Sequence, residues 1–63
     1  MCISTAYRNS ALPENILLKN VRAFRVEGDS VILTNILEQE LTISGTLASA
    51  DLINGVVVIR CDQ

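Results

Sequence analysis

The first two residues, Met1 and Cys2, carry the donor atoms in this chain that are best suited to chemistry. A cysteine thiolate is a soft ligand, and the Cys2 amide and the Met1 amine lie only a few bonds away from it. These three groups can form fused chelate rings around one ion; if Met1 is removed, the Cys2 amine and thiolate can chelate instead. Sulfur and nitrogen donors suit a square-planar divalent ion such as nickel or copper. The N-terminus is therefore the candidate metal site.

One copy of the chain supplies too few donors at this site for the four positions of a square plane. Two copies of Cys2 that meet across a two-fold axis would complete it, because a symmetric interface brings a residue close to its own image. The chain has no histidine, so a preformed tetrahedral zinc site within one copy is not expected. Ligand chemistry alone leaves nickel, copper, cobalt and zinc open.

A lone cysteine near the end of a strand is more commonly a small buried hydrophobic residue than a ligand, and this interpretation applies to both cysteines. We interpret Cys61 as structural or incidental. A sharper hypothesis is that the first and last strands are neighbours, so that Cys61 lies near Cys2 and forms a disulfide with it or supplies a second thiolate. Tyr7 and Phe24 are expected in the core or at an interface.

The remaining polar side chains do not form a catalytic set. Asp29 and Asp51 are expected to stabilise turns, and residues 38–40 (Glu-Gln-Glu) are expected in a solvated turn. No pair of groups is available to act as general acid and base on Cys2 or on a water molecule. An enzyme is therefore the least favoured class.

Composition indicates a small β protein. The chain has 63 residues, of which 49% are hydrophobic, but it has one Phe, one Tyr and no Trp. The core must therefore be built from Val, Ile and Leu, which favour strands. A domain of this size buries only about 60% of the surface of its unfolded chain. A partner subunit would add stability, and we expect a homodimer.

Charge and hydropathy exclude several classes. The formal net charge is −2, with five Lys and Arg in total, so the surface offers no electrostatic basis for binding nucleic acid. Two cysteines are too few for a disulfide scaffold. We find neither a secretory signal pattern nor an apolar run of the roughly 20 residues that span a membrane. The chain is expected to be soluble and cytoplasmic.

Short alternating apolar runs separated by turn residues predict strands along the whole chain. A bulge or kink is expected near residues 19–20, and Pro13 should lie in a loop. The apolar run 31–37 is expected to be a strand with both faces covered. Asn54-Gly55 predicts a hairpin with a type I′ turn. Other strands are expected near residues 3–7, 14–18, 21–26, 40–44, 46–53 and 56–60.

These strands predict an all-β fold: a small antiparallel barrel or sandwich of five to seven short strands, in one domain over residues 1–63. Such a small sheet leaves edges exposed. Closure into a barrel, or addition of a strand across a homodimer interface, would remove them.

The Met-Cys start and the order of the turns resemble the CooT family of small nickel-binding proteins. The likeness covers nearly the whole chain. The matching pattern is Val21-x5-Glu27-Gly28-Asp29-x-Val31-x-Leu33-x-Asn35-Ile36-x5-Thr42-x2-Gly45, followed by Asp51-Leu52-x-Asn54-x2-Val57-Val58.

The resemblance implies a β-rich homodimer that binds nickel through Cys2. It also implies a client enzyme: the protein would assist the maturation of a nickel enzyme such as carbon monoxide dehydrogenase. The chain is also similar to the HypC-like hydrogenase chaperones, which begin with Met-Cys, but it lacks their proline shortly after the cysteine and their longer C-terminal tail. The alternatives are thus a HypC-like assembly chaperone and a dimeric interaction module that does not itself carry metal.

Overall fold

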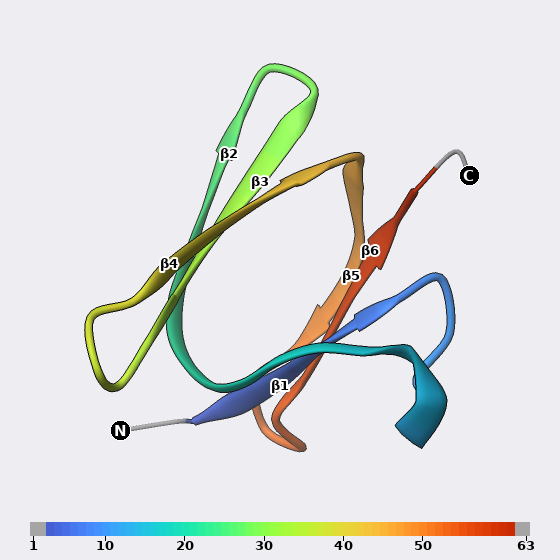
Figure 1. Ribbon diagram of the computed structural model, residues 1–63. Helices are drawn as coiled ribbons and strands as arrows, with labels where there is room; N and C mark the ends of the chain where they lie inside the picture. Colours follow the sequence, from blue (N-terminus) through green and yellow to red (C-terminus); the bar gives the residue numbers. More distant parts are fainter. Residues whose placement is uncertain (1–2, 62–63) are drawn as a thin grey trace.

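The computed structural model describes residues 3–61, and its six strands form one sheet in the order β4-β3-β2-β1-β6-β5 (Figure 1). The strands are β1 (Ser4–Arg8), β2 (Ile16–Glu27), β3 (Ser30–Asn35), β4 (Glu40–Ser44), β5 (Thr46–Asp51) and β6 (Val56–Arg60). A 3-10 turn, η1 (Pro13–Asn15), lies in the loop between β1 and β2. Within residues 3–61, no helix has the length and apolar character needed to cross a membrane. The prediction of an all-β fold with five to seven strands is confirmed.

The sheet differs from the predicted antiparallel barrel or sandwich in two respects. The β1–β6 pair is parallel, while the other four pairs are antiparallel. A parallel pair needs a long connection, and here the four intervening strands supply it. The sheet is also not closed: its two edge strands, β4 and β5, follow one another through Gly45 and diverge from that corner (Figure 1).

The long strand β2 carries the predicted bulge. Its first half pairs with β1 and its second half with β3, and the register shifts between Val21 and Ala23. Asn20 has a positive φ of 59°, a conformation that asparagine tolerates better than most residues. The bulge lets one strand bend from one neighbour to the other, which curves the sheet around its core.

The core consists of alternate residues on the inner face of the sheet. Val31 and Leu33 of β3 and Val57 and Ile59 of β6 are fully buried, with Ala6 and Val21 beside them. This spacing of two follows from the pleat of a strand. The prediction that residues 31–37 form a strand covered on both faces is wrong. β3 ends at Asn35, and the two residues that follow lie exposed in a turn.

The predicted β5–β6 hairpin is present, but its turn is not type I′. The connection has four residues, 52–55, and Gly55 is the only one of them with positive φ, whereas type I′ needs positive φ at both central residues. The side chain of Asp51 organises this turn instead, by accepting hydrogen bonds from Asn54.

Candidate functional site

The predicted metal ligands, Met1 and Cys2, lie outside the described residues. The structure does describe the chain to which they are bonded, from Ile3 into β1. Ile3 is 48% exposed, and the next residue, Ser4, is buried. The residues around Ile3 and Ser4 are therefore the described residues nearest to the predicted ligands.

Exposed aliphatic side chains gather at the end of the sheet where β1 begins. In the register, Ser4 pairs with Val21 and Val21 with Asn35, while Thr5 pairs with Val56. The start of β1, the end of β3 and the start of β6 therefore share one end of the sheet. Of the seven exposed large hydrophobic residues within residues 3–61, five lie there, and we call them the apolar end: Ile3, Ile36, Leu37, Leu52 and Ile53.

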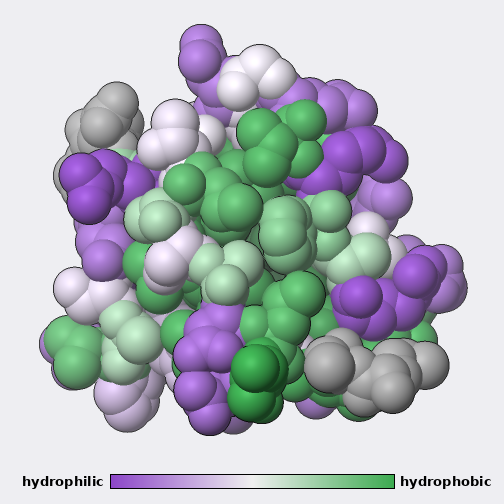
Figure 2. Space-filling view, turned by 180° about the vertical axis from the view of Figure 1, so that it is seen from behind, coloured by the Kyte–Doolittle hydropathy of each residue, from purple (hydrophilic) through white to green (hydrophobic). Residues whose placement is uncertain are grey.

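The exposure of the apolar end is pronounced. Leu37 is 72% exposed and Ile53 is 94% exposed, although burial of one such side chain is worth about 1.5–3 kcal/mol. Figure 2 shows hydrophobic side chains gathered over the middle of one face of the molecule and continuing to its edge. A grouped apolar surface on a small protein commonly marks a site of interaction with another molecule, whereas scattered exposed residues do not.

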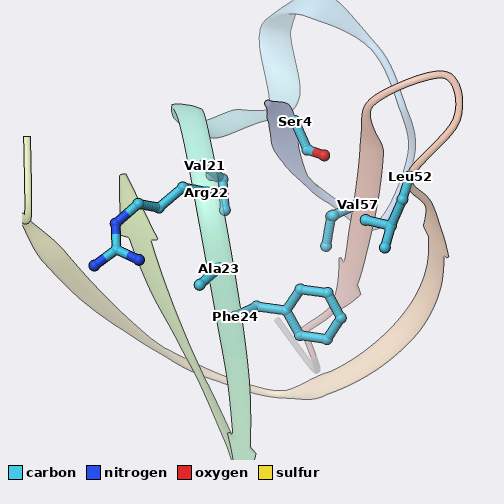
Figure 3. A pocket seen from close by; sticks show the side chains of 7 residues that line it. All are labelled: Ser4, Val21, Arg22, Ala23, Phe24, Leu52 and Val57. Atoms are coloured by element: carbon cyan, nitrogen blue, oxygen red, sulfur yellow. The ribbon is translucent and has the colours of Figure 1, made fainter. Parts of the chain in front are cut away.

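An open pocket of about 290 Å³ adjoins the apolar end. Phe24 of β2 and Leu52 of the β5–β6 turn face each other across it, and the Ser4 hydroxyl points toward it from β1 (Figure 3). The guanidinium of Arg22 turns away from this space. The pocket is thus mainly apolar and suits an aliphatic side chain. Its lining residues are Ser4, Val21, Arg22, Ala23, Phe24, Leu52 and Val57.

The β3–β4 turn, which carries part of the apolar end, is held by Asn35. This side chain is only 6% exposed. Its Oδ1 accepts hydrogen bonds from the amides of Leu37 and Gln39, both at 3.0 Å, and its Nδ2 donates to Gln39 Oε1 at 2.8 Å. The turn thereby presents Ile36 and Leu37 on a fixed backbone although neither side chain is packed in the core.

A surface ion pair joins the same turn to β2. Arg22 Nη2 lies 2.7 Å from Glu38 Oε1, and this carboxylate raises the pKa of Arg22 by its hydrogen bond and its charge. Both side chains are exposed, so the pair contributes little to stability. The pair engages the guanidinium of Arg22, so Arg22 does not offer the pocket a free cation.

Cys61 is a free, half-buried thiol packed against the core. Its amide donates to Asn9 Oδ1 at 2.9 Å, just beyond the last residue of β1. The first and last strands are indeed neighbours, as the Cys61 hypothesis assumed. Because they run parallel, however, Cys61 lies beside the end of β1 and not beside its start. This placement favours the structural interpretation of Cys61.

The described residues contain no group of three or more His, Cys, Asp or Glu side chains placed to hold a metal ion. Two predicted side-chain roles are confirmed: Phe24 packs on the core, and Asp51 stabilises a turn. The predicted solvated turn at residues 38–40 is shorter than expected, because Glu40 already belongs to β4. Sequence reasoning did not identify the pocket or the apolar end. The signal was the pair of aliphatic residues in each of two turns, Ile36-Leu37 and Leu52-Ile53, where polar residues are usual.

These features define a small open β-sheet protein with an exposed apolar surface and pocket around the start of its first strand. The sequence matches the family described as CO dehydrogenase accessory protein CooT over residues 1–60, so the chain belongs to this family. Its members are accessory proteins of carbon monoxide dehydrogenase. No curated protein matches the sequence.

Proposed function

We propose that this protein is a cytoplasmic accessory protein, not itself an enzyme, that holds nickel for the maturation of a carbon monoxide dehydrogenase. Membership of the CooT family over residues 1–60, a range that includes Met1 and Cys2, carries this proposal. The thiolate of Cys2 is the principal ligand. The Cys2 amide and the Met1 amine add nitrogen donors when Met1 is retained, and this donor set suits a square-planar Ni²⁺ ion.

A second copy of the chain completes the site. Cys2 is bonded to Ile3, a member of the apolar end, and one residue extends a chain by at most about 3.6 Å. Two copies that dock through their apolar ends would bring their two thiolates to the same region. A symmetric dimer of this kind needs a surface that is complementary to itself.

Two neighbouring features of the apolar end support this arrangement. Ile53, the most exposed aliphatic residue, follows Leu52, which lines the pocket. A projecting side chain beside a pocket of suitable size lets each copy insert Ile53 into the pocket of the other. A stable interface buries about 800 Å² per partner, which is about a fifth of the 4214 Å² surface of this chain.

A nickel titration followed by ultraviolet and visible absorption tests the ligand assignment. The reduced protein should develop a thiolate-to-nickel charge-transfer band that saturates, and the Cys2→Ser variant should lack it. Cys61→Ser is the matched control, because it removes the other thiol of the chain and should leave the band unchanged. If Cys61→Ser lost the band and Cys2→Ser kept it, Cys61 and not Cys2 would be the thiolate ligand.

The pH dependence of nickel binding gives a second test. The thiol must lose its proton to bind, and the amide must do so where it takes part, so affinity should rise with pH through the neutral range. An affinity that does not change with pH would contradict thiolate ligation. No metal uptake, together with capture of the free protein by carbon monoxide dehydrogenase, would favour the assembly-chaperone alternative.

A further inference from the structure

The β5–β6 turn contains a chemically labile dipeptide. Five asparagines occur in the chain, and Asn54 is the one that is followed by glycine. Gly55 has no side chain to keep its backbone nitrogen away from the Asn54 side chain, and Asn54 itself is exposed to water in an irregular segment. Nothing in the proposed nickel site uses this pair of residues.

We propose that Asn54 is a site of spontaneous deamidation, and that Asp51 sets its rate by holding the side-chain amide of Asn54. In the reaction, the Gly55 nitrogen loses its proton and attacks Asn54 Cγ. The side-chain nitrogen leaves as ammonia and a five-membered succinimide remains. Water then opens the ring at either carbonyl and leaves aspartate or isoaspartate. The net change consumes one water and releases one ammonia.

The contacts of Asp51 restrain this reaction. Asn54 Nδ2 donates to Asp51 Oδ2 at 2.7 Å, and the Asn54 amide donates to Asp51 Oδ1 at 3.1 Å. These bonds tie the side-chain nitrogen and the backbone nitrogen of Asn54 to the same carboxylate. While the bond to Asp51 Oδ2 holds, the Asn54 side chain is less free to bring its Cγ to the Gly55 nitrogen. Asp51 therefore slows a reaction that the sequence alone would favour.

Deamidation would weaken the turn that supports β1. The product places a carboxylate where an amide donates to Asp51, so a hydrogen bond is replaced by repulsion between like charges. The Gly55 carbonyl accepts a hydrogen bond from the Thr5 amide at 2.9 Å, and Gly55 packs so closely that an added Cβ would lie 2.9 Å from the Ile3 carbonyl oxygen. An isoaspartate adds a backbone atom at this position and would displace these contacts.

Peptide mapping by mass spectrometry tests the inference. The metal-free protein is incubated at neutral pH and 37 °C, and the gain of about one mass unit on the peptide that contains Asn54 is followed with time. It should appear in the wild type. It should form about two- to tenfold faster in Asp51→Asn and Asp51→Ala, the range that corresponds to release of one net hydrogen bond. Asp29→Ala, which removes a carboxylate from another turn, should match the wild type.

Two outcomes would overturn the proposal. Absence of the product from Asn54 in every variant would remove the site, and equal rates in the wild type and both Asp51 variants would remove the role of Asp51. Circular dichroism identifies any variant that has unfolded. If Asp51→Ala has unfolded, the deamidation rate of the milder Asp51→Asn is compared with that of the wild type. In Asn54→Asp, which stands for the direct product, the Thr5 amide should exchange with solvent faster than in the wild type.

Discussion

The Asn35 side chain supports one half of the apolar end from inside the molecule. It is buried, and its Oδ1 accepts hydrogen bonds from the backbone amides of Leu37 and Gln39 in the β3–β4 turn. Replacement by alanine would leave both amides without this partner. We expect Asn35→Ala to lower the free energy of unfolding by about 1–3 kcal/mol. Urea denaturation measures this change.

A matched control is available in Asn15→Ala. The Asn15 side chain makes one long hydrogen bond, 3.4 Å from Nδ2 to the Ser10 carbonyl oxygen, near the surface. Its loss should change stability by less than about 0.5 kcal/mol. Equal effects of the two substitutions would show that the hydrogen bonds of Asn35 do not stabilise the turn.

Asp51 makes the β5–β6 turn sensitive to acid. The hydrogen bond from the Asn54 side chain, followed by that from the Asn54 amide, lowers the pKa of Asp51 below its ordinary value of 3.8. A lowered pKa in the folded state means that unfolding takes up a proton as the pH falls. The stabilisation is thus present above about pH 4 and is lost as the pH falls through the folded-state pKa.

The difference in unfolding free energy between the wild type and Asp51→Asn should accordingly shrink as the pH is lowered from 6 to 3. Because Asp51 is exposed, the difference will be small, and salt will reduce it further. Nuclear magnetic resonance titration of the Asp51 carboxyl measures the pKa directly. A value above that of Asp51 in the unfolded chain would contradict the contact with Asn54.

At the scale of elements, Gly45 forms the corner between the two edge strands. A Cβ at this position would lie 2.4 Å from the Arg60 carbonyl oxygen, which belongs to rigid backbone. The Gly45 amide also donates to the Asp29 carbonyl oxygen at 2.8 Å. The close approach at Gly45 therefore lets the chain pass from β4 to β5 while it stays in contact with β6 and with the β2–β3 hairpin.

We expect Gly45→Ala to destabilise the protein by about 3 kcal/mol, because the backbone of β4, β5 or β6 must move. Gly28→Ala is the matched control: Gly28 has a φ of +58° but open space around it. It should cost only about 1 kcal/mol, the strain of a left-handed conformation. Thermal unfolding of the two variants compares them. A smaller effect at Gly45 than at Gly28 would contradict the close approach.

Local sequence patterns predicted most of these elements, because alternation and turn chemistry act over a few residues. The bulge near Asn20, the loop at Pro13 and the β5–β6 hairpin were all predicted. The Cys61 hypothesis assumed that β1 and β6 are neighbours, but their parallel orientation was not predicted, since these strands lie about fifty residues apart and no turn residue specifies it. The end of β3 was also missed, because Ile36 and Leu37 continue an apolar run whose interruption depends on the buried bonds of Asn35.

At the scale of the whole molecule, the apolar end is the surface that we assign to the second copy. Ile53→Asp places a charge on the most exposed aliphatic residue, and it should weaken the dimer of the metal-free protein at least tenfold, the equivalent of about 1.4 kcal/mol. Val26→Asp is the control, because Val26 is 52% exposed but lies near the β2–β3 turn, away from the apolar end.

Sedimentation equilibrium over a range of concentrations would measure both dimer constants. If Val26→Asp weakened the dimer and Ile53→Asp did not, the interface would lie at the other end of the sheet. If the wild type and both variants were all monomers, the apolar end would instead be available to the client enzyme, as in the assembly-chaperone alternative.

The candidate site was predictable only in part. Cys2 was singled out by the chemistry of its thiol and by a family pattern that extends along the chain. The structure gives many residues of that pattern a role in the fold: Asp51 and Asn54 hold a turn, Asn35 holds another, and Gly45 permits a close approach. The sequence shows the aliphatic pairs of the two turns, but it could not predict that they lie near Ile3, because these three segments are brought together only by the pairing of strands.

Native mass spectrometry of the nickel-loaded protein tests the central claim most directly, because it counts chains and metal ions in the same particle. The proposal predicts one nickel ion bound to two chains in the wild type and in Cys61→Ser, and no bound nickel in Cys2→Ser. One nickel ion on each single chain, or undiminished binding by Cys2→Ser, would contradict a site formed by two Cys2 thiolates.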